Sequence, residues 1–223
     1  MFVGHYGAAL ALKSVERKAP LGLLFLGVQF IDVLFFPLVL LGIERMTIVP
    51  HATDSTHFRL EYMPFTHSLI GSLLWAALFG LVFALARRGA KHRWRIAFAL
   101  GVAVFSHWVF DFFVHTPDLP LVTNSSTKLG LGLWNSAPVT YGLEALLLVV
   151  GLYLYMKTTV PAPKSTLARL GMPGLVIFLL LLNVYNIFGP PPPGFAGVFF
   201  LAMASYLGFA GIAFWLDRLR TPA

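Results

Sequence analysis

Six apolar stretches, each about as long as a bilayer-crossing helix, limit what this chain can fold into. About 20 consecutive apolar residues cross the hydrocarbon core of a membrane as an α-helix. A shorter apolar piece, residues 1–12, precedes the six and cannot span. The pattern predicts an all-α fold, in which residues 1–223 form one polytopic transmembrane bundle of six spanning helices plus a short N-terminal half-helix. The six stretches are residues 20–43, 64–86, 95–115, 138–156, 170–188 and 194–216.

Composition supports a membrane protein. Hydrophobic residues make up 58% of the chain and charged residues only 11%, whereas a soluble domain has about 25% charged residues. There is no cysteine, which excludes disulfides, thiolate nucleophiles and cysteine-ligated metal sites.

The Lys and Arg residues are segregated between alternate loops. Thirteen of the 16 lie before the first stretch, between the second and third, between the fourth and fifth, or after the last. Only Arg45, Arg59 and Lys128 lie in the other loops. The positive-inside rule then predicts that both termini are cytoplasmic, and we expect a protein of the cytoplasmic (inner) membrane of a bacterium. The net charge of +7 is explained by topology and by contacts with anionic lipid, so nucleic-acid binding is excluded.

Six ionisable residues interrupt the apolar segments. A charged side chain at the bilayer centre costs about 2.5–3.5 kcal/mol, so each of them needs a physical reason. Counting about 1.5 Å of helix per residue from the nearest cytoplasmic charge places them at similar depths, slightly outward of the midplane. We therefore expect them to form one cluster. The six are His5, Asp32, His67, His107, Asp111 and Glu144.

His107, Asp111 and His115 are spaced four residues apart and lie on one face of a helix. A His and an Asp one turn apart project toward a common point. Histidine and carboxylate ligands suit Zn²⁺, or Fe or Mn when oxygen ligands are more numerous. The pattern predicts a divalent metal site, most readily Zn²⁺. The expected ligands are His5, Asp32, His67, His107 and Asp111.

Residues around this cluster are candidates for catalysis and substrate contact. Glu144 either orients a ligand histidine, acts as a general base or pairs with Thr140 one turn away. The loop 116–137 is rich in Pro and Gly and is expected to form an ordered cap over the site. The candidate catalytic residues are Glu144, His115 and Asp118, and the candidate substrate contacts are Lys128, Trp134 and Asn135. Alternatively, Trp134 is an interfacial tryptophan and Lys128 a surface lysine. His51 and His57 are expected to be solvated.

The motifs also resemble a known family. "GH" at 4–5, Asp32, "FTHSL" at 65–69 and "SHWVFD" at 106–111 are similar to motifs of membrane-bound metal-dependent hydrolases, also described as LexA-binding inner-membrane hydrolases. The resemblance covers roughly residues 1–125 and implies a metal at the same five ligands. The set is also distantly similar to zinc-dependent phospholipase C, which implies phosphoester hydrolysis.

These features predict a membrane-embedded hydrolase that cleaves a lipid or phosphoester with a metal-activated water. Two other classes stay open. Buried Asp, Glu and His also serve ion- or proton-coupled transporters. In a structural or regulatory membrane protein, the same side chains would only hydrogen-bond neighbouring helices.

Overall fold

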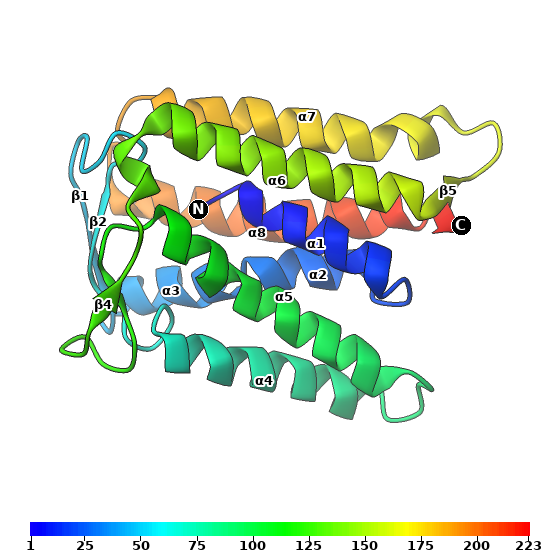
Figure 1. Cartoon of the computed structure of the whole chain (residues 1–223), viewed down its shortest axis with the longest axis horizontal. Helices are drawn as coiled ribbons and strands as arrows, with labels where there is room; N and C mark the ends of the chain where they lie inside the picture. The colour runs from blue at the N-terminus through cyan, green and yellow to red at the C-terminus, as the bar shows by residue number, and fades with distance from the viewer.

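A computed structural model describes all 223 residues, and its helices follow the apolar stretches (Figure 1). Five helices, α4 to α8, are long and apolar enough to cross a membrane. A single 3₁₀ turn, η1 (Leu133–Asn135), precedes α6. The α-helices are α1 (Gly4–Val15), α2 (Leu21–Val28), α3 (Phe30–Leu40), α4 (Leu69–Ala86), α5 (Arg93–Val114), α6 (Ala137–Lys157), α7 (Thr166–Phe188) and α8 (Phe195–Asp217).

The first apolar stretch is broken rather than continuous. Helices α2 and α3 meet at an angle of 48°, and the two together can form a sixth span. The break lies at Gln29, whose backbone angles (φ −109°, ψ 4°) are not helical. The buried side-chain amide of Gln29 donates to the carbonyl oxygen of Phe2 at 2.9 Å, which ties the break to the start of the chain.

Helix α4 begins at Leu69, five residues later than the apolar stretch predicts. The hydroxyl oxygen of Ser68 accepts a hydrogen bond from the backbone N–H of Gly71 and caps the helix. Residues 64–68 therefore form an irregular segment, and His67 lies in that segment instead of on the helix.

The prediction of an all-α fold missed three small antiparallel sheets of two strands each. The long loops 44–63 and 116–137 pair part of their own backbone, because buried or half-buried N–H and C=O groups need partners. Sheets β1–β2 and β3–β4 lie at one end of the bundle, and β5–β6 lies near the C-terminus at the other end (Figure 1). We call residues 44–63 and 116–136 the cap. The strands are β1 (Arg45–Ile48), β2 (Phe58–Tyr62), β3 (Leu119–Pro120), β4 (Lys128–Leu129), β5 (Thr159–Pro161) and β6 (Arg220–Pro222).

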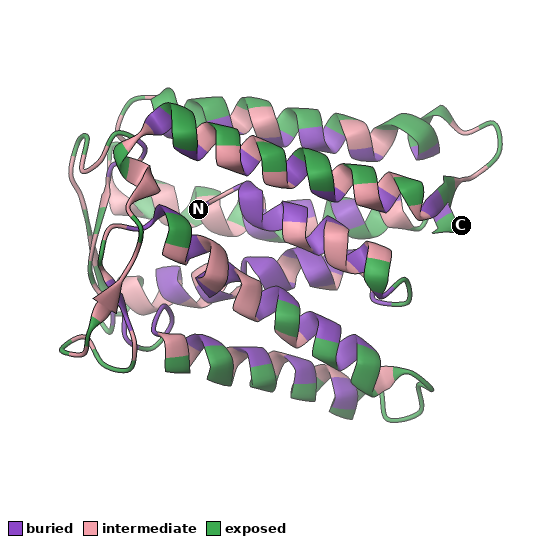
Figure 2. Ribbon diagram, in the orientation of Figure 1, coloured by how far each residue is buried: buried purple, intermediate pink, exposed green.

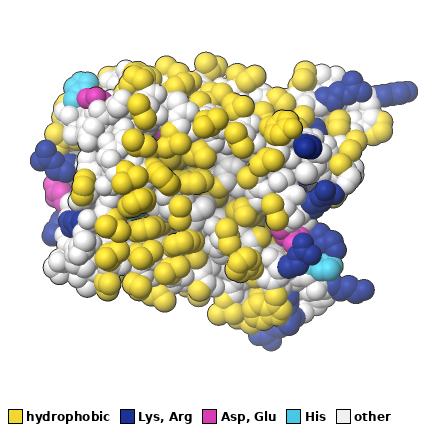
Figure 3. Space-filling model, viewed as in Figure 1, with side chains coloured by type: hydrophobic (Ala, Val, Ile, Leu, Met, Phe, Trp, Pro, Cys, Tyr) yellow, Lys and Arg dark blue, Asp and Glu magenta, His cyan; other side chains and the backbone are white.

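The outer helix faces are apolar and exposed (Figure 2). Leu74, Phe98 and Leu181 are 66%, 76% and 65% exposed. Hydrophobic side chains cover the middle of the face in Figure 3, and many of its Lys and Arg side chains gather at the end opposite the cap. This distribution matches that of a helical bundle surrounded by lipid.

The short helix α1 is packed inside the bundle and begins near its middle (Figure 1). A Cβ atom added to Gly7 would collide with the backbone of Leu147, and one added to Gly151 would collide with the backbone of Gly7. The two glycines thus allow α1 and α6 to approach closely. This approach places His5 in the interior.

Candidate metal site

Four segments bring ionisable side chains to one buried region near the cap. His5 comes from α1, Asp32 from α3, His67 from the segment before α4, and His107 and Asp111 from α5. Oδ1 of Asp32 lies 3.3 Å from Nε2 of His67 and 3.7 Å from Nε2 of His107. The structure thus brings together all five side chains that the sequence predicted as metal ligands.

Asp111 lies at the centre of this cluster. Its Oδ2 atom is 3.0 Å from Nε2 of His107, 3.6 Å from Nε2 of His115 and 3.9 Å from Nε2 of His67. Its Oδ1 atom is 3.3 Å from Nε2 of His5. His107 and Asp111 therefore lie on the buried face of α5, as their spacing predicts, and His115 follows directly after the helix and is also buried.

Asp32, His67 and His107 form a group whose candidate ligand atoms lie within 4.8 Å of one another. A tetrahedral zinc ion with bonds of about 2.0 Å separates its ligand atoms by about 3.3 Å. The separations of 3.0 to 3.9 Å among Asp32, His67, His107 and Oδ2 of Asp111 bracket that value. Asp32, His67 and His107 can therefore surround a single ion, and Asp111 lies directly beside them.

A second group, His5, His107 and Asp111, meets the same distance criterion. However, the rings of His5 and His107 are stacked, with centroids 4.0 Å apart and planes 8° apart. A metal ion lies in the plane of each imidazole that binds it, and two parallel planes share no point. His5 and His107 therefore cannot bind one ion in these orientations, whereas the ring planes of His67 and His107 cross at 66°.

The hydrogen bond at Nδ1 of His107 determines which ring nitrogen faces the cluster. Nδ1 lies 2.7 Å from the carbonyl oxygen of Val28, at the break between α2 and α3. A carbonyl only accepts, so Nδ1 carries the hydrogen and Nε2 is left to the cluster. Nε2 is buried and makes no hydrogen bond, although Oδ2 of Asp111 is only 3.0 Å away.

His67 is oriented through a relay that the sequence reasoning missed. The hydroxyl of Thr66 donates to Oε2 of Glu44 at 2.6 Å and lies 2.8 Å from Nδ1 of His67. Since that hydroxyl hydrogen is used, the hydroxyl accepts from Nδ1–H, and Nε2 faces Asp32. Glu44 is fully buried and also accepts from the backbone N–H of Phe65. In the sequence, Glu44 stands out only as an acidic residue directly after an apolar stretch.

Tyr206 on α8 is a second residue that the sequence reasoning missed. Its hydroxyl donates to Oδ2 of Asp32 at 3.1 Å, which leaves Oδ1 directed at His67 and His107. A tyrosine within an apolar stretch gives no signal of this role.

His115 and Asp118, two of the predicted catalytic residues, lie beside the cluster. Nδ1 of His115 donates to Oδ1 of Asp118 at 2.8 Å, so Nε2 faces Asp111. The ring of His115 also packs on Trp134, with centroids 4.1 Å apart. His115 is 2% exposed, so this arrangement is held inside the protein.

Glu144 does not contact a ligand histidine or Thr140, contrary to two of the predictions for it. Its Oε2 atom accepts from the backbone N–H groups of Phe2 at 3.1 Å and Gly4 at 2.9 Å. The first N–H groups of a helix have no acceptor within the helix. Glu144 supplies an acceptor for the N–H group of Gly4, the first residue of α1. The hydroxyl of Thr140 donates instead to the carbonyl oxygen of Leu133.

Only one of the three predicted substrate contacts lies beside the cluster. Trp134 lines a cavity beside the cluster, whereas Lys128 and Asn135 do not. Lys128 is in strand β4 and pairs with Pro120, and Asn135 is exposed. The expectation of a solvated His57 is also wrong, because His57 is buried and its Nε2 donates to the carbonyl oxygen of Gly189 at 3.1 Å. His51 is exposed, as expected.

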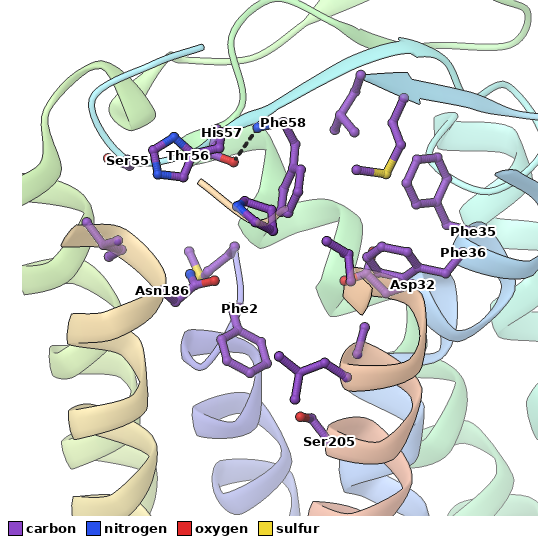
Figure 4. Close-up of a pocket in the computed structure, with 18 of the residues that line it drawn as sticks. Phe2, Asp32, Phe35, Phe36, Ser55, Thr56, His57, Phe58, Asn186 and Ser205 are labelled. Atoms are coloured by element: carbon purple, nitrogen blue, oxygen red, sulfur yellow. Dashed lines mark hydrogen bonds between the residues drawn. The ribbon is translucent and has the colours of Figure 1, made fainter. Parts of the chain in front are cut away.

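A cavity of about 490 Å³ adjoins the cluster, within the size range of small-molecule sites. Asp32, His67, Asp111 and His115 are among its lining residues. Most of its other walls are apolar. In Figure 4, Asn186 on α7 and Ser205 on α8 lie on opposite sides of it, with Phe2 between them.

Comparison with known proteins identifies no relative. No protein-family model, no curated protein and no solved structure matches the chain.

Proposed function

We propose that this protein is a membrane-embedded, metal-dependent hydrolase that acts on a lipid. The observation that carries the proposal is the orientation of His67 and His107. Both use Nδ1 for a hydrogen bond outside the cluster and direct Nε2 at the same carboxylate, that of Asp32. Outer hydrogen bonds of this kind commonly orient metal-binding histidines.

The electrostatics of the cluster favour a bound cation. In the neutral form of His67 and His107 that carries its hydrogen on Nδ1, the lone pair of Nε2 faces carboxylate oxygens at 3.0 to 3.7 Å, and the two repel. The amino group of Met1 pairs with Oδ1 of Asp111 at 2.7 Å, but no Lys or Arg side chain forms an ion pair with Asp111 or Asp32. Buried charges of one sign are costly without a partner. A divalent metal ion, with Zn²⁺ the first expectation, would relieve this repulsion and balance the carboxylate charge that the Met1 amino group leaves.

The residues around the ligands suit hydrolysis. A divalent metal ion would supply Lewis-acid activation of the substrate and of a water molecule. Nε2 of His115 faces the cluster and can take or give a proton. Asp118 holds the His115 ring in the orientation that this transfer needs.

The position of the cavity supports a lipid substrate. The cluster lies between helices suited to cross a membrane, and the cavity beside it is largely apolar. Many Lys and Arg residues lie at the end opposite the cap, and the positive-inside rule therefore favours an orientation with the cap outside the cytoplasm.

The cavity also favours a hydrolase over the alternative of an ion-coupled transporter. All of its lining residues lie at the cap end or next to the cluster. A core of 21 buried hydrophobic residues, including Leu10, Phe25 and Leu100, fills the other half of the bundle. This apolar packing favours a site that opens at one end over a path that crosses the bundle.

The experiment that tests the proposal is metal analysis by mass spectrometry. Wild-type protein purified in detergent without chelator is compared with His107→Ala, Asp111→Ala and His92→Ala. His92 is exposed on the loop before α5 and serves as the matched histidine control. We expect one equivalent of metal in the wild type and in the control, and its loss in the other two folded variants. A wild-type protein without metal overturns the proposal.

A further inference from the structure

The charged side chains that line the cavity indicate which class of lipid it can bind. Three carboxylates, those of Asp32, Asp111 and Glu144, line it, but no Lys or Arg does. The amino group of Met1 lies 2.7 Å from Oδ1 of Asp111 and is the one cation beside them. The side chains of the cavity wall are thus acidic rather than basic, apart from its histidines, and no Lys or Arg is present to pair with an anionic phosphate group.

The cap lies at one end of the cavity and is joined by hydrogen bonds to the segments around it. The hydroxyl of Ser55 donates to that of Thr140 at 3.1 Å, and the backbone N–H of Ser55 donates to the carbonyl oxygen of Trp134 at 3.0 Å. His57 joins the cap to Gly189 at the end of α7. Figure 4 shows Ser55, Thr56 and His57 at one end of the cavity, above the helices.

The cavity reaches the lipid-facing surface between α7 and α8. Tyr185 on α7 and Leu201 on α8 both line it and are 64% and 66% exposed. Gly197 and Ala202, two other lining residues of α8, are small and leave room between the helices. Within the cavity, Asn186 and Ser205 offer neutral hydrogen-bonding groups.

We propose that a neutral lipid enters between α7 and α8 and places its acyl chain along this cavity, with an ester or amide carbonyl at the metal site. This rests on the proposed function and names its substrate class. In the reaction, the oxygen of water bonds to the carbonyl carbon and the bond to the alcohol oxygen or amine nitrogen breaks. The proton released by water passes to that leaving group. The products are a fatty acid and a neutral alcohol or an amine, and nothing is oxidised or reduced.

The first test measures binding and needs no catalysis. Protein in nanodiscs is irradiated with a monoacylglycerol that carries a diazirine in its acyl chain, or with a lysophosphatidic acid that carries the same chain. We expect the monoacylglycerol to label peptides of α7 and α8 several-fold more strongly. Leu201→Trp should block this labelling, whereas Leu207→Trp, at an exposed α8 position outside the cavity, should not. Equal labelling by the anionic lipid, or labelling elsewhere only, overturns the inference.

The second test measures hydrolysis by metal-loaded protein. We expect release of fatty acid from neutral acyl lipids, and a phosphate-containing product from anionic phospholipids would overturn the inference. The two proposals fail in different ways. Metal-bearing protein that is not labelled on α7 and α8 overturns this inference alone. Protein that is labelled but binds no metal overturns the proposed hydrolase and leaves the lipid cavity supported.

Discussion

Asp118 holds the ring of His115 through a hydrogen bond of 2.8 Å between Oδ1 and Nδ1. The bond connects the cap to the end of α5 and turns Nε2 of His115 toward Oδ2 of Asp111, 3.6 Å away. A buried histidine held in this way is positioned for proton transfer, because one nitrogen is fixed as a donor and the other faces the reacting region.

Asp118→Ala should slow hydrolysis and leave the metal bound. Without its partner, the His115 ring can rotate, and loss of general acid–base catalysis typically costs about 10²-fold or more in rate. The measurement is kcat for fatty-acid release, together with metal content. Asp54→Ala, at an exposed position of the cap, is the matched control. Unchanged kcat in Asp118→Ala would remove His115 from the mechanism.

Thr66→Val should weaken metal binding. The substitution keeps the shape of the side chain but removes the hydroxyl that links His67 to Glu44. Loss of such an outer hydrogen bond typically lowers metal affinity about 10–100-fold. Titration against a competing chelator measures the change. Thr47→Val, on the exposed hairpin where Thr47 donates to Glu61, should have wild-type affinity. Equal affinity in both variants would contradict the relay.

Glu144→Ala should destabilise the protein without removing the metal. The substitution leaves the backbone N–H groups of Phe2 and Gly4 without their acceptor in the interior, at a cost of about 1–3 kcal/mol. Glu144→Gln should cost less, because its amide oxygen can still accept. Unfolding in detergent and metal analysis are the two readouts. A stable Glu144→Ala variant that has lost activity would instead support the role of general base.

Gly151→Ala should destabilise the packing of α1 on α6. The added methyl group would collide with the backbone of Gly7, and overpacking of this kind costs about 1–3 kcal/mol. Gly142→Ala, on the same helix with open space around it, is the control and should be neutral. Thermal unfolding in detergent compares the two. A Gly151→Ala variant as stable as the control would show that α1 can move away from α6.

Local sequence patterns predicted most of the helices. Apolar length and hydropathy depend on neighbouring residues only, so the apolar stretches coincide with helices within a few residues. The exceptions were the break at Gln29 and the late start of α4. Both depend on hydrogen bonds made by particular side chains, and the apolar pattern continues through them. No local sequence pattern predicted the paired strands of the cap either.

The sequence by itself determined that the chain is built from bilayer-length helices, and it predicted that His5, Asp32, His67, His107 and Asp111 form one cluster, because hydropathy and the spacing of residues along a helix follow from residue order. Only the tertiary structure decided which nitrogen of each histidine faces the cluster. It also decided that His5 stacks on His107, that Glu44 and Tyr206 support the site, and that Glu144 serves α1. These relationships join residues far apart in the chain, so they depend on how the helices cross and pack.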